Sequence, residues 1–258
     1  MDAIDLDTPA LFVDRDVLER NIARMQQQCR TWGVALRPHV KTHKIAEIAQ
    51  MQLDAGAIGI TVAKLGEAEV LPGDDVLVAY PLLQPKLPRL RALAKTRTLK
   101  VAVDSVDVAR DLQGIETLVE IDVGVGRCGA QSPEQAVAIA QACSDFRGIF
   151  YWPSWLDEAG FQAACVKIDA GSKTFSSDQT VGAGTFGHFV ERPWTMRKLN
   201  EEHGYVEIDG RGGPRIGEKV WVVPSHVCAT VNLHDEIWYG RGGRVEGSWK
   251  VAARGKVR

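Results

Sequence analysis

The chain has 258 residues, which is long enough for one large domain or two modest ones around a substantial core. Its 31 Lys and Arg residues are balanced by 33 Asp and Glu residues, so the charge gives no case for binding nucleic acid or an anionic membrane. We expect no membrane span, because no apolar run of about 18 residues is present, and no secretory leader, because the N-terminus is acidic. The five cysteines are scattered and odd in number, which favours a reducing cytoplasm over a disulfide framework.

Strand and helix signals alternate as far as residue 152, which is typical of a parallel α/β sheet. Leu18, Ile22 and Met25 recur at helical spacing, and Ser132-Pro133 reads as the N-cap and first residue of a later helix. Strands are expected at residues 35–40, 59–63, 75–80, 99–104, 117–123 and 147–152, and helices at 17–32, 45–55, 65–71, 85–94, 106–112 and 133–143.

The pattern changes after residue 152. Glycines become frequent and short alternating runs predict strands at residues 206–209, 219–223, 236–239 and 251–253, with a hairpin turn at 241–245. We therefore predict two domains, a (β/α) barrel-type domain over residues 1–152 and a small antiparallel β domain over residues 153–258.

The first candidate for chemistry is the run Arg37-Pro38-His39-Val40-Lys41-Thr42-His43-Lys44. A lysine at the carboxyl end of a strand lies where α/β folds place their chemistry, and it can form a Schiff base with a carbonyl compound. The cations around Lys41 are expected to disfavour protonation of its amine. The alternative is a solvated basic loop.

The second candidate is the pair His226 and Cys228, in the run Val220 to Val231. We read this run as a strand, so that residues two apart point to the same face. An imidazole and a thiolate on one face would form half of a tetrahedral zinc site. The alternative is a buried cysteine beside an incidental histidine.

Taken together, six segments in order resemble the D-serine dehydratase and D-threonine aldolase family, whose members use pyridoxal 5'-phosphate (PLP) and have the alanine racemase-like fold. The segments are residues 7–11, 37–44, 120–129, 169–173, 201–204 and 224–232. The resemblance implies that Lys41 holds PLP as a Schiff base and that His226 and Cys228 bind zinc beside it. It also implies a D-amino acid substrate and a homodimer.

The resemblance further implies that Arg127, in its Gly-x-Gly-Arg context, reaches the phenolic oxygen of PLP, where a guanidinium keeps that oxygen ionised. An arginine in a surface turn is the alternative. His39 and His43 are expected at the same strand end as Lys41, and we include His39 among the cofactor contacts, with packing or surface exposure as the alternative.

The leading hypothesis is a zinc-dependent dehydratase that converts a D-β-hydroxy-amino acid to a keto acid and ammonia. Within the resemblance, His-x-Cys with zinc goes with dehydratases, and His-x-Asp with manganese goes with D-threonine aldolases. Cys228 favours the former, since soft sulfur prefers zinc to manganese. The alternatives are aldol cleavage and a non-catalytic PLP-binding relative.

One departure from the family pattern concerns length. The family barrel has eight strands, and about six are expected here before the β domain begins. An internal segment near residues 148–155 is therefore expected to be missing from the recorded chain or deleted from the gene, unless a partner subunit completes the fold.

Overall fold

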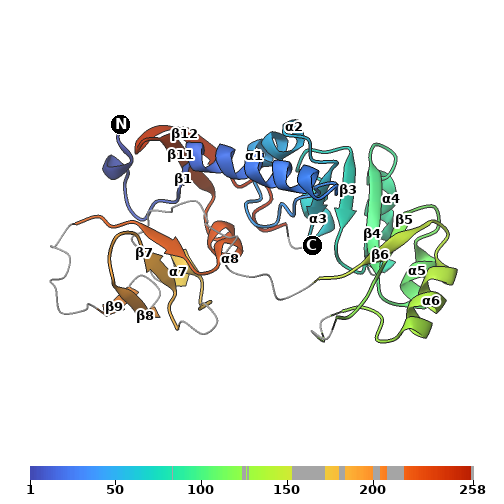
Figure 1. Cartoon of the computed structure of the whole chain (residues 1–258). Helices are drawn as coiled ribbons and strands as arrows, with labels where there is room; N and C mark the ends of the chain where they lie inside the picture. The colour runs from blue at the N-terminus through green and yellow to red at the C-terminus, as the bar shows by residue number, and fades with distance from the viewer. Residues whose placement is uncertain are drawn as a thin grey trace. The chain divides into compact units, whose positions relative to one another are not determined.

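The computed structural model describes residues 1–82, 84–123, 126, 128–152, 172–179, 184–199, 204–207 and 218–256 (Figure 1). These residues form two compact units. The parallel unit holds residues 33–41, 49–152 and 256, and the antiparallel unit holds residues 1–32, 42–48 and the described residues from 172 to 255. The units interleave along the chain, whereas the predicted domains meet at a single boundary, at residue 152.

The parallel unit is built on a five-stranded parallel sheet of order β2-β3-β4-β5-β6. Its strands are β2 (Ile60–Val62), β3 (Asp75–Val78), β4 (Thr98–Val103), β5 (Glu116–Glu120) and β6 (Phe146–Phe150). Val62, Val78 and Val101 are fully buried, as expected for the continuous apolar strands of a parallel sheet. The predicted parallel α/β arrangement is therefore confirmed.

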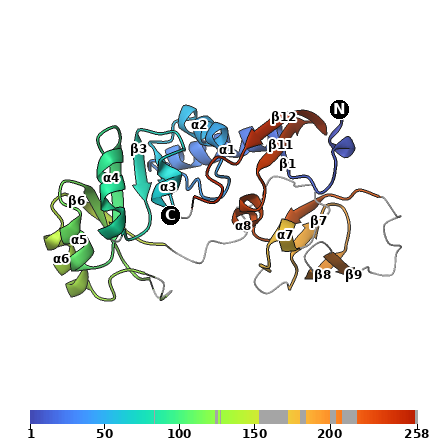
Figure 2. The ribbon, with the colours of Figure 1, turned by 180° about the vertical axis from the view of Figure 1, so that it is seen from behind.

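Helices connect these strands as the alternating pattern predicts. They are α2 (Ala46–Asp54), α3 (Leu65–Ala68), α4 (Leu87–Leu93, after the 3-10 turn η2, Gln84–Lys86), α5 (Val106–Asp111) and α6 (Pro133–Ala142). The hydroxyl of Ser132 accepts a hydrogen bond from the backbone N–H of Gln135 at 3.2 Å, which confirms the predicted N-cap of α6. Helices α5 and α6 lie side by side next to β5 and β6 (Figure 2).

The predicted strand at residues 35–40 is wrong in extent. Only His39 forms a ladder pair, a parallel bridge to Thr61 of β2, supported by hydrogen bonds from Thr61 N–H to Pro38 O (2.8 Å) and from Val40 N–H to Thr61 O (2.9 Å). Pro38 has no N–H to donate, which prevents a longer ladder. The segment still runs beside β2 and in the same direction.

The antiparallel unit contains two sheets. The first has the order β1-β11-β12, with β1 (Phe12–Asp14) parallel to β11 (Glu236–Arg241) and β11 antiparallel to β12 (Arg244–Lys250). Gly242 and Gly243 have φ values of 50° and 77°, as a type I′ turn requires, which confirms the predicted hairpin. The predicted strand at residues 251–253 is wrong, since β12 ends at Lys250 and a turn follows.

The second sheet has the order β10-β7-β8-β9 and is antiparallel (Figure 1). Its strands are β7 (Gly187–Phe189), β8 (Thr195–Leu199), β9 (Gly204–Glu207) and β10 (Val222–Pro224). The unit also contains η1 (Ala3–Asp5), α1 (Arg15–Thr31), α7 (Ser172–Phe175) and α8 (Val227–Asn232). The parallel sheet of one unit and the antiparallel sheet β10-β7-β8-β9 of the other match the predicted fold class. Among the described residues, none of the helices combines the length and apolarity that a membrane crossing requires.

Candidate active site

Lys41 lies at the carboxyl edge of the parallel sheet. It follows the His39–Thr61 bridge by two residues, and its backbone N–H donates to His39 Nδ1 at 3.3 Å. The lysine is half-buried, and its ammonium group has no hydrogen bond or ion pair within the described residues. The structure therefore places Lys41 and His39 together at the edge of the sheet where α/β folds bind their ligands.

Two of the cations expected to crowd Lys41 are bound elsewhere, which corrects the sequence analysis. The guanidinium of Arg37 pairs with both carboxylate oxygens of Asp75, at 2.9 Å each. The Nζ of buried Lys44 donates to Asn232 Oδ1 at 2.8 Å. Proximity in sequence suggested one basic cluster, but the backbone directs these two side chains to different partners.

The amino edge of the same sheet carries a network of paired charges. Asp75, at the start of β3, accepts hydrogen bonds from Arg37 and from Lys100 Nζ (2.9 Å), and Lys100 also reaches Glu116 at 3.1 Å. Burial by itself would raise the pKa of Asp75, but the hydrogen bonds and charges of Arg37 and Lys100 outweigh burial and hold that pKa below its ordinary value. Arg37 therefore belongs to this edge and has a structural role.

The carboxyl edge carries three residues that the sequence analysis did not single out. Lys64 follows β2, Tyr80 follows β3 and Lys86 ends η2. The Nζ of Lys64 lies 3.4 Å from the centroid of the Tyr80 ring, and the Nζ of Lys86 lies 5.5 Å from it. Lys64 directly follows the expected strand 59–63 and Tyr80 ends the expected strand 75–80, and these positions are the signal that would have identified them.

The loop after β5 is held by Asp122. Its carboxylate accepts hydrogen bonds from Gly126 N–H (3.1 Å) and from the amide nitrogen of Gln131 (3.0 Å). Gly129 has φ of 111°, and a Cβ there would lie 2.5 Å from the backbone nitrogen of Asp122, so the turn requires glycine. Arg127, the predicted partner of the PLP oxygen, lies outside the described residues.

His226 and Cys228 do not lie on a strand, so the prediction that their side chains point to one face of a strand is wrong. β10 ends at Pro224, His226 is the N-cap residue of α8, and Cys228 lies in the first turn of that helix. The run reads as β-like because of its valines, but the helix is fixed by contacts from distant segments. The structure records no contact between the two side chains within the described residues.

Each of the two residues has a partner within the antiparallel unit. The Nδ1 of exposed His226 is hydrogen-bonded to the carboxylate of Asp178. The thiol of Cys228 donates to the hydroxyl of Thr42 at 3.6 Å, and Thr42 directly follows Lys41 in the chain. A carboxylate on one ring nitrogen is the usual outer contact of a metal-binding histidine, because it leaves the other nitrogen available.

Helix α8 is anchored from several directions. The hydroxyl of buried Thr230 donates to Phe175 O at 3.2 Å, and Asn232 accepts the Lys44 ammonium. Burial lowers the pKa of His234, just beyond the helix, against the opposing effect of a hydrogen bond that the His234 ring donates to the backbone of Thr174. These contacts fix the helix that carries Cys228.

The donor set at this site fits a soft divalent metal only in part. Imidazole and thiolate suit zinc, and Asp178 would orient the imidazole. However, within the described residues no three His, Cys, Asp or Glu side chains are grouped as metal ligands. Any metal here would therefore take its remaining ligands from water, substrate or other residues.

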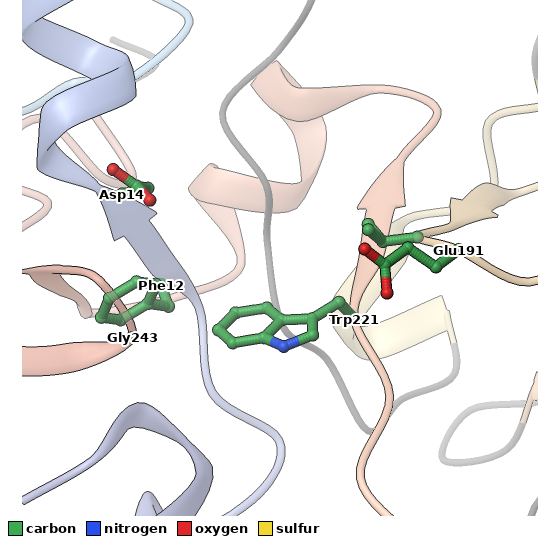
Figure 3. A pocket seen from close by; sticks show the side chains of 6 residues that line it. Phe12, Asp14, Glu191, Trp221 and Gly243 are labelled. Carbon is green, nitrogen blue, oxygen red and sulfur yellow. The ribbon is translucent and has the colours of Figure 1, made fainter.

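A cavity of about 290 Å³ lies in the antiparallel unit (Figure 3). It is lined by Phe12, Asp14, Val190, Glu191, Trp221 and Gly243. The Phe12 and Trp221 rings are 5.7 Å apart and form its aromatic wall. None of the residues predicted for catalysis or metal binding lines this cavity.

Two family models match the chain. "Alanine racemase, N-terminal domain" matches residues 13–175, and "Putative serine dehydratase domain" matches residues 157–239. The first model covers more than half of the chain.

Several curated proteins are similar to the chain. D-threonine aldolase of Arthrobacter sp is 29% identical over 353 positions, which cover 97% of this chain and 93% of that protein. D-threo-3-hydroxyaspartate dehydratase of Delftia sp. (strain HT23) is 39% identical over 149 residues, covering 53% of this chain and 39% of that protein. D-serine dehydratase of Schizosaccharomyces pombe is 31% identical over 233 residues, covering 82% of this chain and 56% of that protein.

The aldolase alignment also bears on chain length. It runs over 353 positions although this chain has 258 residues, so at least 95 positions have no counterpart here. This difference is in line with the five strands that the described residues form where a (β/α) barrel has eight.

The fold of this chain is similar to the folds of several solved structures. The crystal structure of D-threonine aldolase from Filomicrobium marinum has a TM-score of 0.83 at 26% identity, covering 99% of this chain and 98% of that one. Two mutants of a D-threo-3-hydroxyaspartate dehydratase have TM-scores of 0.79 and 0.77 at 23% identity, each covering 97% of this chain and 96% and 98% of theirs. One replaces a histidine by alanine. The other replaces a cysteine two positions further on and is described as metal-free.

Proposed function

Because the chain belongs to the family of D-serine dehydratases and D-threonine aldolases, PLP-dependent lyases of the alanine racemase-like fold, we propose that it acts on a D-amino acid with a β-hydroxyl group. The leading reaction is dehydration, in which water is eliminated and the resulting enamine is then hydrolysed to a keto acid and ammonia. D-serine would yield pyruvate and ammonia. The observation that carries the proposal is the half-buried Lys41 at the carboxyl edge of the parallel sheet, with no ion-pair partner within the described residues.

Lys41 would have two tasks. Its amine would hold the cofactor covalently, and after the substrate amine replaces it, the same amine would take the proton from the α-carbon. When bound, PLP supplies an electron sink for the carbanion that this proton transfer leaves. An ammonium group without a carboxylate partner suits both tasks, because no ion pair has to break before the amine reacts. We propose His39 and Arg127 as further cofactor contacts.

His226 and Cys228 are the proposed zinc ligands. The hydrogen bond between His226 Nδ1 and Asp178 would leave Nε2 for the metal, and the Cys228 sulfur favours zinc over manganese. Bound zinc would supply a Lewis acid for the β-hydroxyl, which is otherwise a poor leaving group. A histidine and a cysteine two positions apart are also the residues replaced in the two dehydratase mutants, one of which is metal-free.

Aldol cleavage is the second candidate, because D-threonine aldolase aligns with nearly the whole chain. In that reaction a base takes the proton of the β-hydroxyl and the Cα–Cβ bond breaks. D-threonine would then give glycine and acetaldehyde. The products therefore distinguish the two reactions. We further propose a homodimer in the cytoplasm, and sedimentation of the purified chain tests the dimer.

The test is to incubate the purified chain with PLP and zinc and to supply D-serine, D-threonine or D-threo-3-hydroxyaspartate. Dehydration predicts a keto acid and ammonia in equal amounts. Glycine and an aldehyde would instead support the aldolase. If no product forms from any of the three, the proposed function is wrong.

The metal ligands are tested with a matched pair of cysteine variants. We expect Cys228→Ala to lose zinc and to reduce kcat/KM by about 100-fold or more, whereas Cys143→Ala, whose thiol donates to Ile139 O at 3.3 Å, retains both. Cys228→Asp should shift the preference from zinc to manganese, because a carboxylate is the harder ligand. Full zinc content in Cys228→Ala, measured by metal analysis, would contradict the assignment.

A further inference from the structure

Two lysines share one aromatic ring at the carboxyl edge of the parallel sheet. The Nζ atoms of Lys64 and Lys86 lie 3.4 Å and 5.5 Å from the centroid of the Tyr80 ring. All three residues are half-buried. Within the described residues, neither ammonium group and no atom of the Tyr80 side chain forms a hydrogen bond or an ion pair.

The strand register places these residues at the same edge as Lys41. Thr61 of β2 is opposite His39 on one side and Leu77 of β3 on the other. Lys41 lies two residues beyond His39, while Lys64 and Tyr80 lie three residues beyond Thr61 and Leu77. Because all three segments run in the same direction, their ends meet at one edge.

The charges in this cluster are not balanced. Two ammonium groups beside one ring repel each other, and a tyrosine face offsets this only by a modest cation–π attraction. Elsewhere in the same unit, Lys100 has a similar degree of burial, but its ammonium lies between two carboxylates. An anion bound beside Lys64 and Lys86 would offset their charge, and the Tyr80 hydroxyl can serve as a further donor.

We propose that Lys64, Lys86 and Tyr80 bind the distal carboxylate of the substrate, so that the preferred substrates are β-hydroxy-D-amino dicarboxylic acids such as D-threo-3-hydroxyaspartate. This inference rests on the proposed lyase function and narrows its substrate class. Two separate ammonium donors suit the two oxygens of a carboxylate. The same donors would also suit a phosphate group, and the experiment distinguishes the substrate carboxylate from the cofactor phosphate.

The experiment compares kcat/KM for D-threo-3-hydroxyaspartate and D-serine in the zinc- and PLP-loaded enzyme. We expect Lys64→Met to lower kcat/KM for the dicarboxylic substrate about tenfold or more, mainly through KM, because a charge-assisted hydrogen bond is lost. D-serine should change by less than about threefold, since it has no group to contact Lys64. Lys86→Met should act in the same direction and Lys64→Arg should restore part of the loss.

The matched control is Lys95→Met, an exposed lysine of the same unit, which should leave both substrates unaffected. An equal loss for both substrates, or no loss for either, would overturn the proposal. Weaker binding of PLP to Lys64→Met, measured by absorbance titration, would also overturn it, because the bound anion would then be the cofactor phosphate.

The subsite can also be tested if the lyase proposal fails. Should the wild-type chain turn over none of the amino acids, calorimetry with D-aspartate and D-alanine tests binding alone. We expect D-aspartate to bind the wild-type chain about ten times more tightly than D-alanine, and Lys64→Met to remove this difference. Equal binding of the two ligands to the wild-type chain would refute the subsite.

Discussion

The amino edge and the carboxyl edge of the parallel sheet hold their charges in opposite ways. At the amino edge Arg37, Asp75, Lys100 and Glu116 bind one another, with Asp75 and Lys100 each contacting two partners of opposite charge. At the carboxyl edge the ammonium groups of Lys41, Lys64 and Lys86 have no carboxylate partner within the described residues.

This difference separates structure from function. Paired charges satisfy one another and hold neighbouring strands in register, so they have little left to offer a ligand. Half-buried charges without partners carry a desolvation cost that an incoming anion or a covalent cofactor can relieve. Substitutions at the two edges should therefore have separable effects, on stability at the amino edge and on activity at the carboxyl edge.

The largest effect is expected from Lys41→Ala. Loss of the amine removes both the cofactor attachment and the base, so kcat should fall at least about 1,000-fold. The melting temperature of the chain without cofactor should change little, because Lys41 has no side-chain partner to lose. Kinetics and thermal melting of the same preparation measure both. Substantial activity in this variant would contradict the assigned role.

Asp75→Asn should have the reverse effect. It leaves Arg37 and Lys100 without the carboxylate that binds them both, so we expect about 2 kcal/mol of stability to be lost, as measured by urea unfolding. Activity per folded molecule should be unchanged, since the network lies at the opposite edge. A loss of turnover without a loss of stability would break the contrast between the edges.

The pKa of Asp75 gives this contrast a pH dependence. Because the pKa in the folded chain is below the ordinary value of 3.8, the unfolded chain binds a proton more readily. The stabilising effect of Asp75 is therefore complete above about pH 5, and it is lost as the pH falls through the ordinary value and then the folded-state pKa. The stability difference between wild type and Asp75→Asn should be constant from pH 7 to about pH 5 and shrink in stronger acid. A stability difference that grows in acid would contradict a folded-state pKa of Asp75 below its ordinary value.

The smallest effect is expected from Glu116→Gln. Lys100 would keep its 2.9 Å contact with Asp75, so no charge is left without a partner. We expect a loss of less than about 1 kcal/mol in urea unfolding, in line with partly exposed ion pairs. A loss as large as that of Asp75→Asn would show that Glu116, rather than Asp75, is the centre of the network.

The sequence alone determined the alternation of strands and helices, the N-cap at Ser132 and the hairpin at Gly242-Gly243. Each of these features depends on residues that are close together in the sequence. It also identified Lys41 as a residue after a strand-like run. These features follow from local periodicity and from backbone preferences that a few residues express by themselves.

Only the tertiary structure decided which partners those residues meet. β1 pairs with β11 across more than 200 residues of chain, Arg37 binds Asp75, and Lys64 lies over Tyr80. The valine-rich run that holds Cys228 forms a helix instead of a strand, because Lys44 and Phe175 anchor it. Register and burial depend on contacts between distant segments, which local propensity does not encode.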